Sequence, residues 1–177
     1  MNFRFNDLHS PINNYIVPGL ISWLVGEPNE KGGLTRIFEM TREQMTLITP
    51  HSHRFGFECR VVQGSVEQTI WTPQPISADQ FDLFSAEEVR YLGEPGKYES
   101  VVQQQFRFSP NTVVYKQGER YSMTHNDIHS IRFGKNTIVL LKELGDQSDE
   151  TITLKPIVDG EVIDTMKVEP WMFRRTK

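Results

Sequence analysis

The chain has 177 residues, a formal net charge of −4 at pH 7 and 37% hydrophobic residues, a length that suits one domain with a sizeable core. Charges of both signs are interspersed and no long apolar run occurs, which argues against a nucleic-acid-binding surface, a membrane span and a signal peptide. The single cysteine, Cys59, excludes an intramolecular disulfide framework and fits a reducing compartment. We therefore expect a cytoplasmic protein that binds neither nucleic acid nor membrane.

The first third of the chain reads as a surface arm followed by strands. Residues 1–19 are polar with few periodic apolar positions, so we expect them to wrap the surface. Residues 21–25 and 34–40 are predicted strands, joined by a turn dense in helix and strand breakers, which indicates a hairpin. Two β-rich runs, 57–63 and 65–71, flank Gly64, which predicts a tight hairpin turn at that glycine.

Residues 72–98 interrupt the strand pattern. Two prolines follow Trp71, and the segment 77–91 then carries a helix signature. Ser77 with Gln80 three positions later is typical of a capping box, and Phe81 and Phe84 would share one helical face with Glu88. We expect a short helical insertion that covers one end of the domain.

Strand signals resume after the insertion and continue almost to the end of the chain. The predicted strands span residues 98–108, 112–116, 120–124, 128–133, 137–143, 151–158 and 161–166, the last two forming a hairpin. About a dozen short strands with one inserted helix predict an all-β sandwich or barrel. We interpret residues 1–177 as a single domain.

Four of the five histidines fall in two short clusters with metal-ligand spacing. His51 and His53 lie two positions apart, which puts them on one face of a strand, and Glu58 follows shortly after. The second cluster holds His125 and His129, the latter eleven residues after Gly118. Imidazole and carboxylate are usual ligands of first-row metals, so a site of His51, His53, Glu58 and His129 is the leading hypothesis. The alternative is a set of buried histidines with purely structural hydrogen bonds.

The spacing resembles that of the cupins, whose first motif is HxH, three or four residues, E, about six residues, G. Here it reads His51-Ser-His53-Arg-Phe-Gly-Phe-Glu58-Cys-Arg-Val-Val-Gln-Gly64. The second cupin motif is G, five residues, PxG, two residues, H, three residues, N. Gly118 and His129 keep its spacing, whereas Thr124, Asn126 and Phe133 replace its Pro, Gly and Asn. The resemblance implies a double-stranded β-helix, the cupin jelly roll, with a metal held by the three histidines and Glu58.

Within the cupins, residues 51–70 and 127–131 look like thiol dioxygenases such as cysteine dioxygenase. That family holds Fe(II) with three histidines, which match His51, His53 and His129. Glu58 stands where the family has Cys or Gly, and this chain offers no counterpart of its carboxylate-binding Arg around Ser22 or of its Tyr near residues 141–143. A glutamate ligand is similar instead to the general four-ligand cupins, which hold Fe, Mn, Ni or Zn.

Three further residues are candidate site residues. If Glu58 points into the barrel, alternation along the strand turns Arg60 inward and Cys59 outward. Arg60 would then bind a substrate carboxylate or phosphate, or pair with a nearby acid such as Glu67. Three roles are open for His125: a base beside the metal, an alternative ligand or an exposed loop residue. Tyr121 is a hydrogen-bond donor next to the metal or an ordinary strand residue.

Two functions follow from these features. The first is a mononuclear oxygenase that binds Fe(II), or alternatively Mn, Ni or Zn, and acts on a small anionic molecule as its substrate partner. The second is a metal- or ligand-binding cupin without turnover, with a regulatory or assembly role. Because exposed strand edges and apolar patches usually need cover, we also expect a homodimer.

Overall fold

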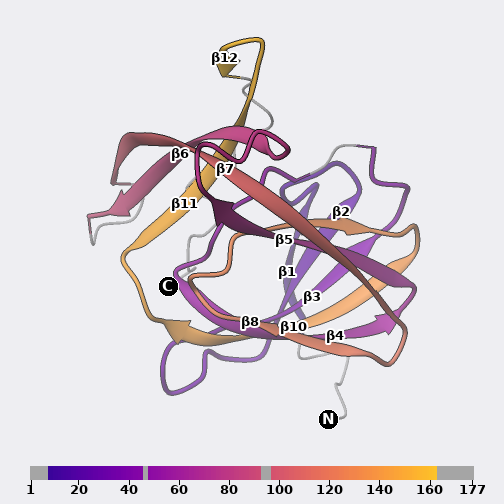
Figure 1. Cartoon of the computed structure of the whole chain (residues 1–177). Coiled ribbons are helices and arrows are strands. Elements are labelled where there is room, and N and C mark those ends of the chain that lie inside the picture. Colours follow the sequence, from indigo (N-terminus) through magenta and orange to yellow (C-terminus); the bar gives the residue numbers. More distant parts are fainter. Residues whose placement is uncertain (1–7, 46–47, 93–96, 163–177) are drawn as a thin grey trace.

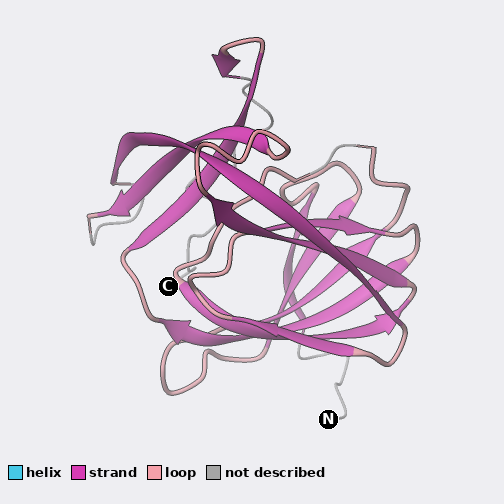
Figure 2. Cartoon of the chain, viewed as in Figure 1, coloured by secondary structure: helices cyan, strands magenta, loops and turns pink. Residues whose placement is uncertain are grey.

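The computed structural model describes residues 8–45, 48–92 and 97–162, and these residues form strands and loops with no helix (Figure 2). The strands are β1 (Leu8–Asn13), β2 (Leu20–Val25), β3 (Thr35–Met40), β4 (Phe55–Gln63), β5 (Ser65–Gln74), β6 (Asp82–Tyr91), β7 (Tyr98–Lys116), β8 (Arg120–Met123), β9 (His129–Phe133), β10 (Thr137–Asp146), β11 (Glu150–Val158) and β12 (Glu161–Val162). The described residues contain no helix that is long and apolar enough to cross a membrane.

The strands form two six-stranded sheets with antiparallel pairing throughout. One sheet has the order β1-β2-β3-β10-β4-β8 and the other the order β12-β11-β6-β7-β5-β9. Figure 1 shows both sheets curling around a common interior, an arrangement compatible with the jelly roll of the cupins. The all-β prediction is confirmed, as is the predicted hairpin β2–β3. The predicted hairpin of 151–158 with 161–166 is confirmed as far as Val162, and residues 163–166 lie outside the described residues.

The main core lies between the curled sheets, because alternate residues of each strand point inward. Its most deeply buried members include Leu20, Met40, Val61, Val66 and Val139, none of which exposes more than 1% of its surface. The strands that supply them come from both sheets. Burial of these apolar side chains therefore holds one sheet against the other.

The face of β4 that points to the interior is the opposite of the predicted one. Phe57, Cys59 and Val61 are buried, whereas Glu58 and Arg60 are exposed. The predicted inward orientation of Glu58 and Arg60 is wrong. The physical reason is the apolar character of the odd-numbered positions. When one side of a strand is exposed to water, burial of its apolar side chains determines which face points inward.

Gly64 is a corner between the two sheets and not the turn of a hairpin. Strand β4 pairs with β10 and β8, whereas β5, which starts at the next residue, pairs with β7 and β9 in the other sheet. Gly64 has a φ of 76°, and a Cβ there would lie 2.5 Å from Oγ1 of Thr137. The prediction of a sharp glycine turn holds, but the pairing expected across it was wrong.

The predicted helix at 77–91 is absent from the described residues. The segment 75–81 forms turns, in which the N–H of Ala78 donates to the carbonyl of Pro75 and the N–H of Phe81 to that of Ala78. Strand β6 then pairs with β11 on one side and β7 on the other. Pairing along both edges outweighs the local helix signal, which is a weak prior. Residues 93–96 of the predicted insertion lie outside the described residues.

Strands β6, β7 and β11 extend beyond the barrel (Figure 1). These three strands supply most of a second apolar cluster. The cluster consists of Phe84, Ala86, Phe108, Ile128 and Leu154, with Trp71 packed against it. Phe84 makes edge contacts with Trp71 and Phe108 at ring-centroid distances of 5.1 and 5.7 Å. Phe84, one of the two aromatic residues that suggested a helical face, is thus buried in this cluster as part of a strand.

The N-terminal segment contributes to the body instead of wrapping its surface. Strand β1 pairs with β2, and Tyr15 and Val17 are buried in the main core. Residues 1–7 of the predicted arm lie outside the described residues. The polar residues around Tyr15 and Val17 suggested a surface arm, although these two residues are buried.

Candidate metal centre

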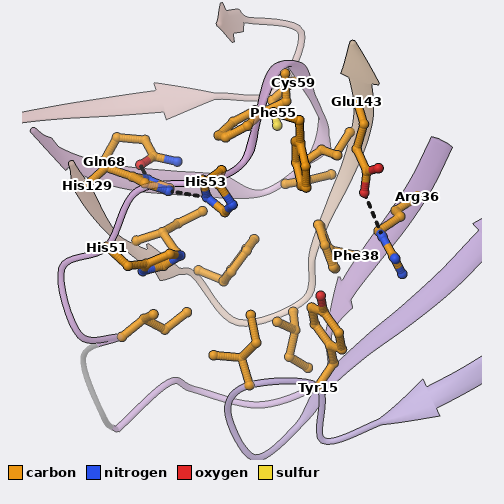
Figure 3. Close-up of a pocket in the computed structure, with 18 of the residues that line it drawn as sticks. Tyr15, Arg36, Phe38, His51, His53, Phe55, Cys59, Gln68, His129 and Glu143 are labelled. Carbon is orange, nitrogen blue, oxygen red and sulfur yellow. Dashed lines mark hydrogen bonds and ion pairs between the residues drawn. The ribbon is translucent and has the colours of Figure 1, made fainter. Parts of the chain in front are cut away.

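Three histidines meet at the place where the approach to β4 crosses β9. His51 forms an isolated antiparallel bridge with His129, the first residue of β9, and the two residues exchange both backbone hydrogen bonds, at 2.9 and 3.0 Å. His51 also bridges to Thr153 of β11, so its backbone is held on both sides. His53 follows two positions later and points to the same side (Figure 3). The ligand-capable nitrogens of the three residues lie within 4.8 Å of one another.

Hydrogen bonds fix the tautomers of two of these imidazoles. Nδ1 of His51 lies 2.8 Å from the carbonyl oxygen of Thr49, which can only accept a hydrogen bond, so the proton sits on Nδ1. Nδ1 of His129 lies 2.8 Å from Oε1 of Gln68 and donates to it in the same way. Both residues therefore direct an unprotonated Nε2 toward the centre, as metal-ligating histidines do.

The third imidazole completes the set. Nε2 of His53 lies 2.8 Å from Nε2 of His129. Because His129 already carries its proton on Nδ1, His53 donates this hydrogen bond in the absence of a metal. Two nitrogens bound at a right angle to an ion at about 2.1 Å would lie about 3.0 Å apart, close to the observed spacing. The spacing of this pair is thus compatible with both nitrogens binding one ion.

Burial keeps all three histidines neutral. It lowers the pKa of His51 and lowers the pKa of both His53 and His129 well below the ordinary value. Proximity to His51 lowers the pKa of the other two further, since a second positive charge would be repelled. Neutral imidazole is the form that binds metal ions, so the environment favours metal binding over protonation.

A line of buried polar groups supports His129 from behind. Nε2 of Gln68 donates to Oη of Tyr121 at 2.9 Å, a contact that joins β5 of one sheet to β8 of the other. The Tyr121 hydroxyl in turn bonds to Cys59, its register partner on β4. Burial, with a smaller contribution from Cys59, raises the pKa of Tyr121 well above its ordinary value. The phenol therefore remains protonated and Gln68 is held with Oε1 toward His129.

The histidines line one side of a cavity of about 70 Å³. Its walls are mainly apolar and aromatic and include Phe38, Phe55, Phe57, Ile131 and Leu141. His53 packs edge-on against Phe57, with ring centroids 5.1 Å apart. Such a lining displaces water from the histidines, which strengthens electrostatic interactions within the cavity.

The structure brings together three of the four predicted ligands. His51, His53 and His129 meet, whereas Glu58 lies on the outer face of β4 and is exposed. The donor set among the described residues is therefore three neutral imidazoles, which fits a divalent transition metal with coordination positions left open.

Of the three other candidate site residues, one lies at the site and two lie away from it. Tyr121 lies at the site and is linked to His129 through Gln68, which hydrogen-bonds to both residues. Arg60 is exposed on the outer face beside Glu58. The imidazole of His125 lies in a loop at 3.0 Å from Oε1 of Gln147 and does not line the cavity.

Sequence reasoning missed three buried polar residues at the cavity. Gln68 lies in an ordinary strand run, and Arg36 and Glu143 come from strands far apart in the sequence. Nε of Arg36 lies 3.2 Å from Oε1 of Glu143, and both side chains are buried. A charged residue at the inward position of an apolar strand was the available signal, since β3 alternates with Arg36, Phe38 and Met40 on one side.

No protein-family model and no curated protein matches the sequence. Solved structures of similar shape include KdgF from Halomonas sp., at 15% identity and a TM-score of 0.44, over 81% of this chain and 94% of that chain. An acetylacetone dioxygenase from Acinetobacter johnsonii matches at 13% identity and a TM-score of 0.43, over 93% and 82%. Hydroxypropylphosphonic acid epoxidase from S. wedmorenis matches at 8% identity and 0.46, over 81% and 58%. At these identities and TM-scores, the roles of individual residues rest on the geometry above.

Proposed function

We propose that this chain is a mononuclear metal-binding cupin that oxygenates a small substrate, with Fe(II) held by Nε2 of His51, His53 and His129. The observation that carries the proposal is the convergence of three neutral imidazoles, two of which have their Nδ1 protons fixed by Thr49 and Gln68. Mn, Ni and Zn bind the same nitrogen ligands, so the choice of Fe(II) over these ions is a separate part of the proposal.

Each group at the site has a distinct task in this proposal. Bound iron would supply redox chemistry and open positions for substrate and O₂. Gln68 keeps the His129 proton on Nδ1, while the aromatic wall around Phe55 and Phe57 excludes water from the reacting atoms. Since the lining is mostly apolar and Arg60 lies outside it, the substrate we propose has an apolar body and is not steered by Arg60.

Metal content tests the centre directly. We expect untagged protein from iron-supplemented cells to contain about one ion per chain, and His53→Ala or His129→Ala to lose it while keeping a β-rich circular dichroism spectrum. His125→Ala is the matched histidine control and Glu58→Ala the matched carboxylate control, and both should retain the metal. Unchanged metal content in the His53 and His129 variants would refute the proposed site.

A second candidate function is a metal-binding module without turnover. The burial of His51 and His129 favours it, because each exposes only 3% of its surface and a sealed ion suits a structural or regulatory role. The two functions differ in O₂ consumption. Iron-loaded protein would be screened with small ketones, alcohols and acids while dissolved O₂ is followed. Zinc in the isolated protein together with no uptake would favour the module.

A further inference from the structure

The cavity has a second polar region, away from the histidines. Figure 3 shows the three histidines on one side of the cavity and Arg36 with Glu143 on the other, with apolar side chains between them. The side chains of Arg36 and Glu143 expose only 7% and 5% of their surface, and both line the cavity.

The carboxylate of this pair is fully engaged by the protein. Oε1 of Glu143 accepts from Nε of Arg36, and Oε2 accepts from the backbone N–H of Leu34 at 3.0 Å. The guanidinium also donates from Nη1 to Oγ of Ser22 at 3.3 Å. No further hydrogen bond of Arg36 occurs among the described residues, so N–H groups at the end of its planar fork remain for a ligand.

Stability alone does not account for the ion pair. The desolvation of two buried charges offsets much of their attraction, and apolar residues of similar size often serve equally well. Here the pair interrupts an otherwise apolar wall instead of lying in solid core. A retained charge pair at the surface of a cavity is better explained by what it contacts in that cavity.

A strained turn brings a third polar group to the same place. The N–H of Val17 donates to the carbonyl of Tyr15 at 2.7 Å, which closes a three-residue turn with Ile16 at its centre. Ile16 has a φ of 65°, an unfavourable conformation for a β-branched residue. The turn places the Tyr15 ring 5.7 Å from the guanidinium carbon of Arg36, and both Tyr15 and Ile16 line the cavity. Backbone strain of this kind concentrates at functional sites.

We propose that Arg36, Glu143 and Tyr15 form a recognition wall for the end of a ligand that points away from the histidines. The ligand class is a neutral molecule with an apolar body and an alcohol or carbonyl oxygen at that end. A neutral oxygen can accept from the spare N–H groups of Arg36. An anion would enter a region whose charges already balance, and would meet the Glu143 carboxylate at the cost of its own desolvation. The inference depends on the proposed function only in taking this cavity as the reaction chamber.

Metal-free protein and three ligands of equal length test the wall: 1-butanol, 1-chlorobutane and butanoate, titrated by nuclear magnetic resonance. We expect roughly tenfold tighter binding of the alcohol than of the chloride, as for a hydrogen bond to a charged group, with butanoate weaker still. The double variant Arg36→Leu/Glu143→Leu should lose the preference for the alcohol. The exposed pair Arg90 and Glu150 supplies the matched control, Arg90→Leu/Glu150→Leu, which should keep it.

A second measurement on wild-type protein holds even if the double variant does not fold. Magnetisation transfer should connect the CH₂ protons next to the butanol hydroxyl with the Tyr15 ring. Transfer to the histidine rings alone, equal binding of alcohol and chloride, tightest binding of butanoate, or a preference that survives the double variant would each overturn the recognition wall. Because no metal is present, loss of the metal proposal would leave these results unaffected.

Discussion

Oε1 of Gln68 lies 2.8 Å from Nδ1 of His129, and this contact determines which nitrogen of the imidazole faces His51 and His53. Gln68 is itself oriented by the hydroxyl of Tyr121, because the amide nitrogen donates to Oη. The two sheets therefore cooperate in presenting one lone pair: His129 and Gln68 belong to one sheet and Tyr121 to the other.

Replacing Gln68 should weaken metal binding without removing a ligand. In Gln68→Leu the His129 proton loses its fixed acceptor, and we expect metal affinity to fall roughly 10–100-fold. The measurement is competition for Zn(II) against chelators of graded affinity. Gln63→Leu is the control, since Gln63 is exposed and its amide donates to the backbone of Asn136. Equal affinities of the two variants would contradict the role given to Gln68.

Cys59 should be chemically inert in the folded protein. Burial raises the pKa of Cys59 from 9.0 to about 12, so the thiolate at a given neutral or mildly alkaline pH is about a thousandfold scarcer than usual. We expect iodoacetamide to label Cys59 slowly, as followed by mass spectrometry, and rapidly once guanidinium chloride unfolds the chain. Above pH 9.0 the unfolded thiol ionises first, so this group lowers stability as pH rises. Fast labelling of folded protein would show that Cys59 is accessible.

Two methionines provide a test of the core. Met40 is fully buried in the main cluster, whereas Met45 exposes 88% of its surface. Met40→Ala should lower the free energy of unfolding by about 2–5 kcal/mol, because it leaves a cavity. Met45→Ala should change it by less than about 0.5 kcal/mol. Chemical denaturation of both variants measures the difference, and similar values would contradict the placement of β3.

The buried ion pair should behave differently from a surface pair. Glu143→Leu alone leaves Arg36 as an uncompensated buried charge and should cost about 3–5 kcal/mol in unfolding free energy, whereas Arg36→Leu/Glu143→Leu should recover most of that loss. The same cycle at Arg90 and Glu150 should show no measurable coupling, since that pair is exposed. Additive losses at Arg36 and Glu143 would argue against a desolvated pair.

Much of the site was predictable from two short histidine clusters. The pattern His51-x-His53 required only local alternation, and His129 matched a known spacing. The orientation of Glu58 follows the strand period and not the spacing of the motif. An odd separation of five residues from His53 puts Glu58 on the opposite face of an unbroken strand, and the apolar Phe57 supports that orientation.

The remaining features depend on contacts that local sequence does not encode. Ser77 and Phe84 gave a reasonable helix signal, but β6 is fixed by β7 and β11 on its two edges. Arg36 and Glu143 are distant in sequence and meet only because β3 pairs with β10. Long-range pairing decided each of these outcomes.

The corner at Gly64 also determines when the metal centre can form during folding. Because β4 and β5 enter different sheets, neither sheet can be completed from neighbouring hairpins alone, and long loops must close before buried contacts compensate for the lost chain entropy. His51 and His53 precede this corner and His129 follows it. The three imidazoles meet only where the segment before β4 bridges to β9, so no local stretch of the chain can assemble the centre by itself.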